Sequence, residues 1–334
     1  MTSPTLLEQP LPKASRRLPT ALHRIGLPVL FFIVTMLSTT AVGMRYMYNF
    51  RLGNPLLATD DDILPFDWVF HNLHLLATGL PFSLTLVGIL LAHEFGHYFA
   101  CRQFGVRSTL PYLLPAPSLS GTFGAVIRLQ SAIRSRSALI VIGASGPIAG
   151  FLVALATVSL GLAWSTYSTT PLLHKVQAPL TISVIHLILQ RASGIDDATA
   201  AQQSLAFIVP HPVLIASWIG LLITALNLIP AGQLDGGHIL YAISPGFHRW
   251  SSRIVIATLF ALGIFNWAGW ILWGIILLMP AMRHPRVPDP FAMTKWQYAL
   301  VPICLFILLF AGTFQPFDGY SLLKILKVLF TRYR

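Results

Sequence analysis

Two histidines and a glutamate occur together in the segment HEFGH, residues 93–97, which follows a long apolar stretch. On a helix, residues four apart share a face, so His93 and His97 can bind one metal ion. Glu94 is offset from His93 by about 100° around such a helix, so its carboxylate can face a metal-bound water. Zinc lowers the pKa of that water to about 7, and a nearby carboxylate can take its proton and later return it. The spacing therefore predicts a zinc site with Glu94 as general base and acid.

A third ligand must come from elsewhere, because a catalytic zinc ion takes three protein ligands and keeps one position open. Of the 11 acidic residues, most lie in polar segments, whereas Glu94 and Asp235 lie inside or at the end of long apolar stretches. Asp235 belongs to the segment NLIPAGQLDGG, in which Pro230 and Gly232 should break a helix. A carboxylate at such a break can point into a helix bundle, which favours Asp235 as the third ligand. The alternative is that Asp235 caps the next helix.

The composition indicates a membrane protein. Charged residues make up 10% of the chain and hydrophobic residues 55%, against about 25% charged residues in an average soluble protein. The mean hydropathy is +0.70. Ionisable side chains at membrane depth are costly and usually functional. The net charge of +11 comes from basic segments beside apolar stretches, so membrane topology and anionic lipids explain it better than nucleic acid, for which no motif is visible.

Stretches without Asp, Glu, Lys or Arg predict six membrane-spanning helices, since about 20 residues cross the hydrocarbon core. We therefore expect an all-α polytopic membrane protein whose membrane domain covers residues 25–317. Basic tails at 1–24, flexible and cytoplasmic, and at 318–334 flank this domain. The expected spans are residues 25–44, 80–104, 138–163, 212–231, 254–281 and 297–317.

The fifth span can be read in two ways. Asn266–Gly269 could turn it into a hairpin of two short crossings, which would give seven spans. Lys and Arg counts favour a cytoplasmic N-terminus but do not choose between six and seven spans. The six-span arrangement has one weak point, because it places Arg283, Arg286 and Lys295 outside.

The segments between the spans carry weaker patterns. Residues 105–136 predict a short β-like hairpin at the membrane surface, and Leu180–Leu189 predicts a helix at the interface. Gly143, Gly146 and Gly150 form a small-residue face that favours close helix packing. The remaining histidines, His284 among them, are scattered and form no metal-ligand pair. For His238, which is near Asp235, an interfacial or core role is favoured over support of the site.

The two motifs HEFGH and NLIPAGQLDGG resemble those of the site-2 protease family of intramembrane zinc metalloproteases. The resemblance covers about residues 80–240, with both motifs in the family's order. It implies a three-helix catalytic core that binds one Zn²⁺ ion through His93, His97 and Asp235. It also implies that Glu94 is the general base and acid, and that a transmembrane substrate helix is cleaved near the cytoplasmic side.

The same resemblance suggests substrate contacts. Asn227 matches the family's asparagine and could bind a substrate backbone or the developing oxyanion, although an interhelical hydrogen bond is an equal alternative. Gly121 and Gly124 lie where the family has a β-like loop, to which an unwound substrate could add a strand. Residues 164–211 leave no room for a PDZ domain, so the chain resembles the compact branch of the family that lacks one.

The sequence thus predicts a zinc metalloendopeptidase that cleaves membrane proteins within the lipid bilayer. We expect it in a bacterial plasma membrane, with an organelle membrane left open, and we expect no nucleic-acid partner. A membrane transporter for metal ions is the alternative, but the polar residues cluster at one site instead of tracing a path. An enzyme of the CaaX type would use a Glu as third ligand, and no Glu follows Glu94. Substrate identity and oligomeric state are not specified by the sequence.

Overall fold

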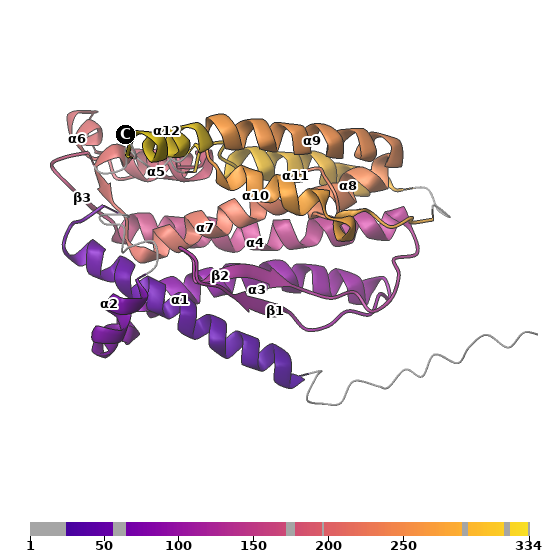
Figure 1. The fold of residues 1–334 in the computed structure, drawn as a ribbon, viewed down its shortest axis with the longest axis horizontal. Helices are drawn as coiled ribbons and strands as arrows, with labels where there is room; N and C mark the ends of the chain where they lie inside the picture. The colour runs from indigo at the N-terminus through magenta and orange to yellow at the C-terminus, as the bar shows by residue number, and fades with distance from the viewer. Residues whose placement is uncertain are drawn as a thin grey trace, which may run out of the picture.

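The computed structural model describes residues 25–55, 65–171, 178–195, 197–288, 293–316 and 321–332. The expected tail at residues 1–24 lies outside this part of the chain. Within it, most residues are helical, and two small antiparallel sheets of two strands each are present. Figure 1 shows the long helices side by side in an elongated bundle.

Three helical segments are long and apolar enough to cross a membrane, judged by length and composition. They are α1 (Leu27–Arg51), α3 (Leu80–Gln103) with the preceding 3-10 turn η3 (Leu73–Gly79), and α4 (Arg136–Trp164). These helices agree with the first three expected spans. Ser135 is the N-cap of α4, and its side chain accepts a hydrogen bond from the Ala138 amide.

The connection between α3 and α4 confirms the expected hairpin. Strands β1 (Tyr112–Pro115) and β2 (Thr122–Val126) pair antiparallel and pack against α1. A second, unexpected sheet joins β3 (Thr166–Tyr167) to β4 (Ile208–Val209) and so closes the segment between α4 and α7. Helix α5 (Leu180–Ala192) covers the expected apolar piece and packs on α4 and on α11 (Lys295–Ala311).

The second half of the chain is more broken than the sequence pattern suggested. Helix α7 (Pro212–Asn227) ends four residues before the expected boundary, and the short helix α8 (Asp235–Ile243) follows. The linker between them turns at Gly232, which has a φ of 58°. Short or irregular elements of the described chain complete the list: α2 (Phe66–His71), α6 (Asp197–Gln202), η4 (Leu205–Phe207), η5 (Pro280–Met282) and α12 (Leu322–Arg332). The last of these is a helix within the segment expected as a tail.

The fifth expected span is two helices. Helix α9 (Pro245–Phe265) and helix α10 (Gly269–Leu278) meet at a break over residues 266–268 and pack against each other. A Cβ at Gly263 would lie 2.3 Å from Cγ1 of Ile271, so the glycine permits this close approach. The structure therefore has the hairpin that the sequence offered as one of two readings.

Helices α3, α4 and α7 form the centre of the bundle, and each packs against the other two. Buried side chains from all three meet there, including Leu86, Val158 and Leu221. A Cβ at Gly220 of α7 would lie 2.9 Å from two side-chain atoms of Ile89 on α3, which shows how closely these helices approach. His93, Glu94 and His97 lie on α3 in this centre, and Asp235 lies on α8, which packs against α4.

Candidate metal centre

His93, Glu94 and His97 lie in the second half of α3 and are almost completely buried. One ligand atom from each residue lies within 4.8 Å of the others. The i, i+4 spacing therefore brings both imidazoles to one place, as predicted. Three such groups buried inside an apolar bundle are expensive unless they are paired or bind a metal.

Asp235 completes the group from the first turn of α8. Its Oδ2 lies 3.1 Å from Nε2 of His93 and 3.3 Å from Nε2 of His97. Ligand atoms about 3.3 Å apart are what tetrahedral zinc requires with bonds of about 2.0 Å. The N-cap of α8 is Leu234, and no side chain forms a cap hydrogen bond there. The Asp235 carboxylate thus faces the histidines and does not cap its helix.

Either carboxylate, that of Glu94 or that of Asp235, lies near the two imidazoles. The same Asp235 oxygen lies 3.1 and 3.3 Å from the two Nε2 atoms, distances that suit two ligands of one metal ion, so Asp235 stays the predicted third ligand. Glu94 lies beside the group, and its carboxylate accepts a backbone hydrogen bond from Ile127; its role in moving a proton stays a prediction.

The main chain of α4 fixes the orientation of His97. Nδ1 of His97 lies 2.7 Å from the Ile142 carbonyl oxygen, which can only accept, so Nδ1–H donates and, in the neutral ring, Nε2 carries the lone pair. That nitrogen is the one that faces Asp235. A hydrogen bond of this kind sets the tautomer of most metal-binding histidines.

Glycines on α4 make room for both imidazoles. A Cβ at Gly146 would lie 2.2 Å from Nε2 of His97, and one at Gly150 would lie 3.1 Å from Cβ of His93. On the other helix, a Cβ at Gly96 would lie 2.4 Å from the carbonyl oxygen of Ser145. The small-residue face does pack helices closely, as expected, and the structure adds that it surrounds the HExxH histidines.

The residues expected to contact substrate differ in their placement. Asn227, the last residue of α7, has Nδ2 3.4 Å from Nε2 of His93. Gly121 has a φ of 74° and lies against α1, where Ser38 Oγ donates to its carbonyl oxygen at 2.7 Å. Gly124 has a φ of 105° and open space where a side chain would be. Close packing on α1 thus accounts for Gly121, and a substrate role stays a prediction for all three.

A second polar cluster, which was not predicted from the sequence, lies beside α8. Nδ1 of His238 is 2.9 Å from Nε2 of His284. His284 was expected to be one of several scattered histidines, but it is paired with His238. Tyr241 stacks on the His284 ring at a centroid distance of 3.8 Å. Because 46 residues separate the two histidines in the chain, no local pattern could have shown their pairing.

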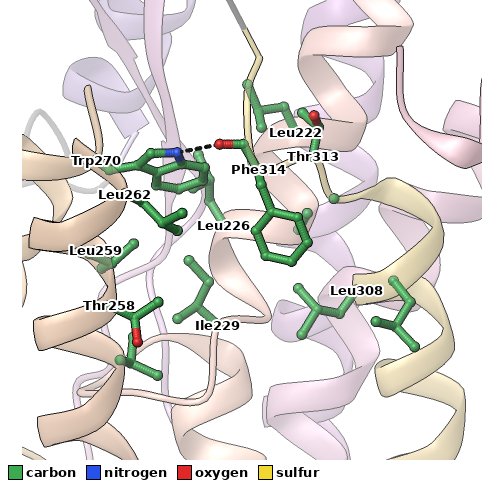
Figure 2. A pocket seen from close by; sticks show the side chains of 14 residues that line it. Leu222, Leu226, Ile229, Thr258, Leu259, Leu262, Trp270, Leu308, Thr313 and Phe314 are labelled. Carbon is green, nitrogen blue, oxygen red and sulfur yellow. Dashed lines mark hydrogen bonds between the residues drawn. The ribbon is translucent and has the colours of Figure 1, made fainter. Parts of the chain in front are cut away.

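An apolar cavity of about 250 Å³ lies between α7, α9, α10 and α11 (Figure 2). Leu226 and Ile229, which flank Asn227 in the chain, are among its lining residues. At one side, Nε1 of Trp270 donates a hydrogen bond to the Phe314 carbonyl oxygen at 2.8 Å. This bond ties the start of α10 to the segment after α11.

The fold and the group around His93 agree with the comparisons to known proteins. The model of peptidase family M50 matches residues 81–265, which include both histidines, Glu94 and Asp235. The chain belongs to this family.

Two curated relatives are zinc metalloproteases by name. "Probable zinc metalloprotease EGY2, chloroplastic" of Oryza sativa subsp. indica is 31% identical over 277 residues, which are 82% of this chain and 48% of the relative. "Probable zinc metalloprotease EGY1, chloroplastic" of Arabidopsis thaliana is 30% identical over 307 residues, 86% of this chain and 53% of the relative. The chain spans about half the length of these relatives.

Proposed function

We propose that this protein is an intramembrane zinc metalloprotease that hydrolyses a peptide bond in or near a transmembrane helix of a membrane-protein substrate. One observation carries the proposal: a single oxygen of Asp235 lies 3.1 and 3.3 Å from Nε2 atoms of two buried histidines on a central helix. Family membership and the names of the relatives support the same reaction class.

In this proposal His93, His97 and Asp235 hold one zinc ion, and their donor set of two imidazoles and a carboxylate suits it. When bound, zinc supplies a Lewis acid that polarises the scissile carbonyl and lowers the pKa of water. Glu94 takes the proton from the attacking water and returns it to the amide nitrogen that leaves. His93, Glu94 and His97 are buried and the Asp235 side chain is 14% exposed, so little bulk water reaches their charges.

Asn227 is close enough to the group to act on the substrate. Its amide lies beside Nε2 of His93, so the same –NH₂ could donate to a peptide oxygen at which negative charge develops. In the proposal, Gly121 and Gly124 belong to a hairpin along which an extended substrate segment pairs. The exposed side chain of Phe123, between them, would meet that segment.

We further infer seven membrane crossings, with α9 and α10 as separate crossings. Gln233, beside Asp235, donates a hydrogen bond to the Arg283 carbonyl oxygen at 2.7 Å, so residue 283 lies at the site's end of the bundle. Gln297, in the first turn of α11, donates to Ser137 Oγ at 2.8 Å in the first turn of α4. A six-span chain would place residue 283 at the opposite membrane face, far from Gln233.

The proposed location is a membrane crossed several times by the chain. The relatives' names include the word "chloroplastic", so the comparisons lend no support to a bacterial plasma membrane over an organelle membrane. No observation favours the transporter alternative, because the polar side chains of the site converge on one point and do not form a path.

The proposal is tested with full-length protein in lipid nanodiscs and a labelled single-span substrate. Wild type should cleave the substrate, and Glu94→Gln should not. A His93→Ala/His97→Ala double variant should lose both zinc and cleavage. Full cleavage by Glu94→Gln would refute the role of Glu94, and undiminished zinc in the double variant would refute the site.

A further inference from the structure

A short strap, residues 281–287, crosses the end of the bundle between α10 and α11 and lies on the segment that carries Asp235. The first contact with the strap along this segment comes from Gln233. Nε2 of Gln233 donates to the carbonyl oxygens of Ala281 at 2.6 Å and Arg283 at 2.7 Å. Both protons of one amide group are thus used to hold the strap two residues before the proposed third ligand.

The strap is bound again one turn further along α8. Nδ1 of His284 lies 2.7 Å from the Pro285 carbonyl oxygen, which can only accept, so the neutral ring has its proton on Nδ1. Nε2 of His284 must then accept, and His238 Nδ1 donates to it at 2.9 Å. The Tyr241 ring stacks on His284 with an angle of 9° between the planes, and its hydroxyl accepts from the Val287 amide at 3.4 Å.

Helix α9 holds the linker before α8 from another direction. Nε2 of His248 donates to the Gly232 carbonyl oxygen at 2.9 Å, and Ser251 Oγ donates to the Pro230 carbonyl oxygen at 2.8 Å. The Gly232 amide donates to Ser252 Oγ at 3.2 Å. Polar contacts from α9 therefore hold the linker at Pro230 and Gly232, and polar contacts from the strap hold Gln233 and α8.

Such support is needed because α8 has only nine residues. A helix this short is not stable by itself in water, so tertiary contacts decide its position. A metal ligand must be held within about 0.5 Å of its working position. Asp235 lies in the first turn of α8, so a small rotation of α8 would move its carboxylate away from the two imidazoles.

We infer that the strap positions Asp235 for metal binding, with His284 and Gln233 as the positioning residues that connect it to α8. This inference rests on the proposed zinc site and adds to it a source of control outside the matched part of the chain, because the family model ends at residue 265. Neither residue need touch the metal or the substrate.

The test is the rate at which the full-length protein in nanodiscs releases zinc to a chelator. His284→Ala should release zinc about 10- to 100-fold faster, the usual effect of losing a group that orients a ligand. Gln233→Glu keeps the size of the side chain, but its carboxylate has no hydrogen to donate to the two carbonyl oxygens. This variant should also release zinc about 10- to 100-fold faster. His284→Gln, which offers an acceptor near the place of Nε2, should restore most of the wild-type rate.

A second readout separates positioning from general stability. The visible spectrum of the cobalt-substituted protein reports ligand geometry, and it should change in His284→Ala and return in His284→Gln. His186 is the control, because it is a buried histidine on α5 whose ring is likewise hydrogen-bonded, to Tyr167 Oη at 3.0 Å. His186→Ala should leave the zinc release rate and the spectrum as in wild type.

Wild-type zinc release and an unchanged cobalt spectrum in both His284→Ala and Gln233→Glu would overturn the inference. Equal acceleration in His284→Ala and His186→Ala would also overturn it, since that indicates general loosening. The proposed function is refuted by a different result, namely a wild type that binds zinc through Asp235 but cleaves no membrane protein. In that case the zinc-release comparison would still show whether the strap positions Asp235.

Discussion

At the scale of single residues, the proposed mechanism gives the two carboxylates of the site two different tasks. Asp235 approaches two imidazole nitrogens with one oxygen, whereas Glu94 lies next to His93 on the same helix. Spacing predicted the position of Glu94, because HExxH fixes its own geometry on any helix. Asp235 was predicted from its place at a helix break beside a long apolar stretch. The supporting residues Gln233 and His284 were not predictable, since their contacts depend on how distant segments dock.

Glu94→Gln tests the division between the carboxylates. The amide has nearly the same shape but cannot take a proton, so substrate cleavage should fall by about 10²- to 10⁴-fold. Zinc content should stay the same if Glu94 is not a ligand. Cleavage rate and zinc content are measured on the same preparation, and zinc loss in this variant would show that Glu94 binds the metal.

Gly146→Ala tests the space that α4 leaves for His97. The new methyl group would lie 2.2 Å from Nε2 of His97, so the imidazole must move, and zinc should dissociate about 10- to 100-fold faster. Gly88→Ala is the matched control, because Gly88 is helical and has nothing within 4 Å of its would-be Cβ. If both variants release zinc at the wild-type rate, α4 does not confine the ligand.

At the scale of elements, the long helices were predictable and the broken ones were not. Apolar runs predicted α1, α3 and α4 because nothing interrupts them. The apolar stretch at 254–281 contains no charged residue that would mark its division at residues 266–268. The turn-forming residues there were the one indication of the break in the sequence. The early end of α7 and the short α8 are set by Pro230, Gly232 and the contacts of the strap.

The start of α7 carries a prediction about pH. His211 caps this helix, and its Nδ1 accepts a hydrogen bond from the Val213 amide at 3.2 Å, which requires an unprotonated nitrogen. Burial lowers the pKa of His211 below 6.5, so the unfolded chain takes up a proton before the folded chain does. This contribution to stability is present above pH 6.5 and declines as the pH falls.

His211→Asn is the comparison, because asparagine caps helices well and does not titrate. Thermal unfolding in nanodiscs should show a larger loss of stability for wild type than for His211→Asn between pH 7.5 and about 5.5. An equal loss in both proteins would mean that the cap does not depend on the protonation of His211.

At the scale of the whole molecule, the helices bring the site, the strap and the first turn of α11 to one end of the bundle. Charge counting could not decide between six and seven spans, because the basic residues after α10 fit either face. Composition does not show which ends of distant helices meet. The structure shows it by two hydrogen bonds, one between Gln233 and Arg283 and one between Gln297 and Ser137.

Cysteine labelling tests this arrangement in sealed vesicles. With Cys101 and Cys304 replaced by serine, Arg107→Cys and Arg286→Cys should react with a membrane-impermeant maleimide from the same side, since both positions are exposed at the site's end. Labelling from opposite sides would contradict seven crossings and restore the six-span arrangement.

We propose above all that His93, His97 and Asp235 bind one zinc ion. The most direct measurement is the zinc-to-protein ratio of purified wild type, Asp235→Ala and Glu94→Gln after dialysis against a weak chelator. We expect a ratio of about one in wild type and Glu94→Gln, with three ligands retained, and near zero in Asp235→Ala. Retention of zinc by Asp235→Ala, together with its loss from Glu94→Gln, would contradict the account.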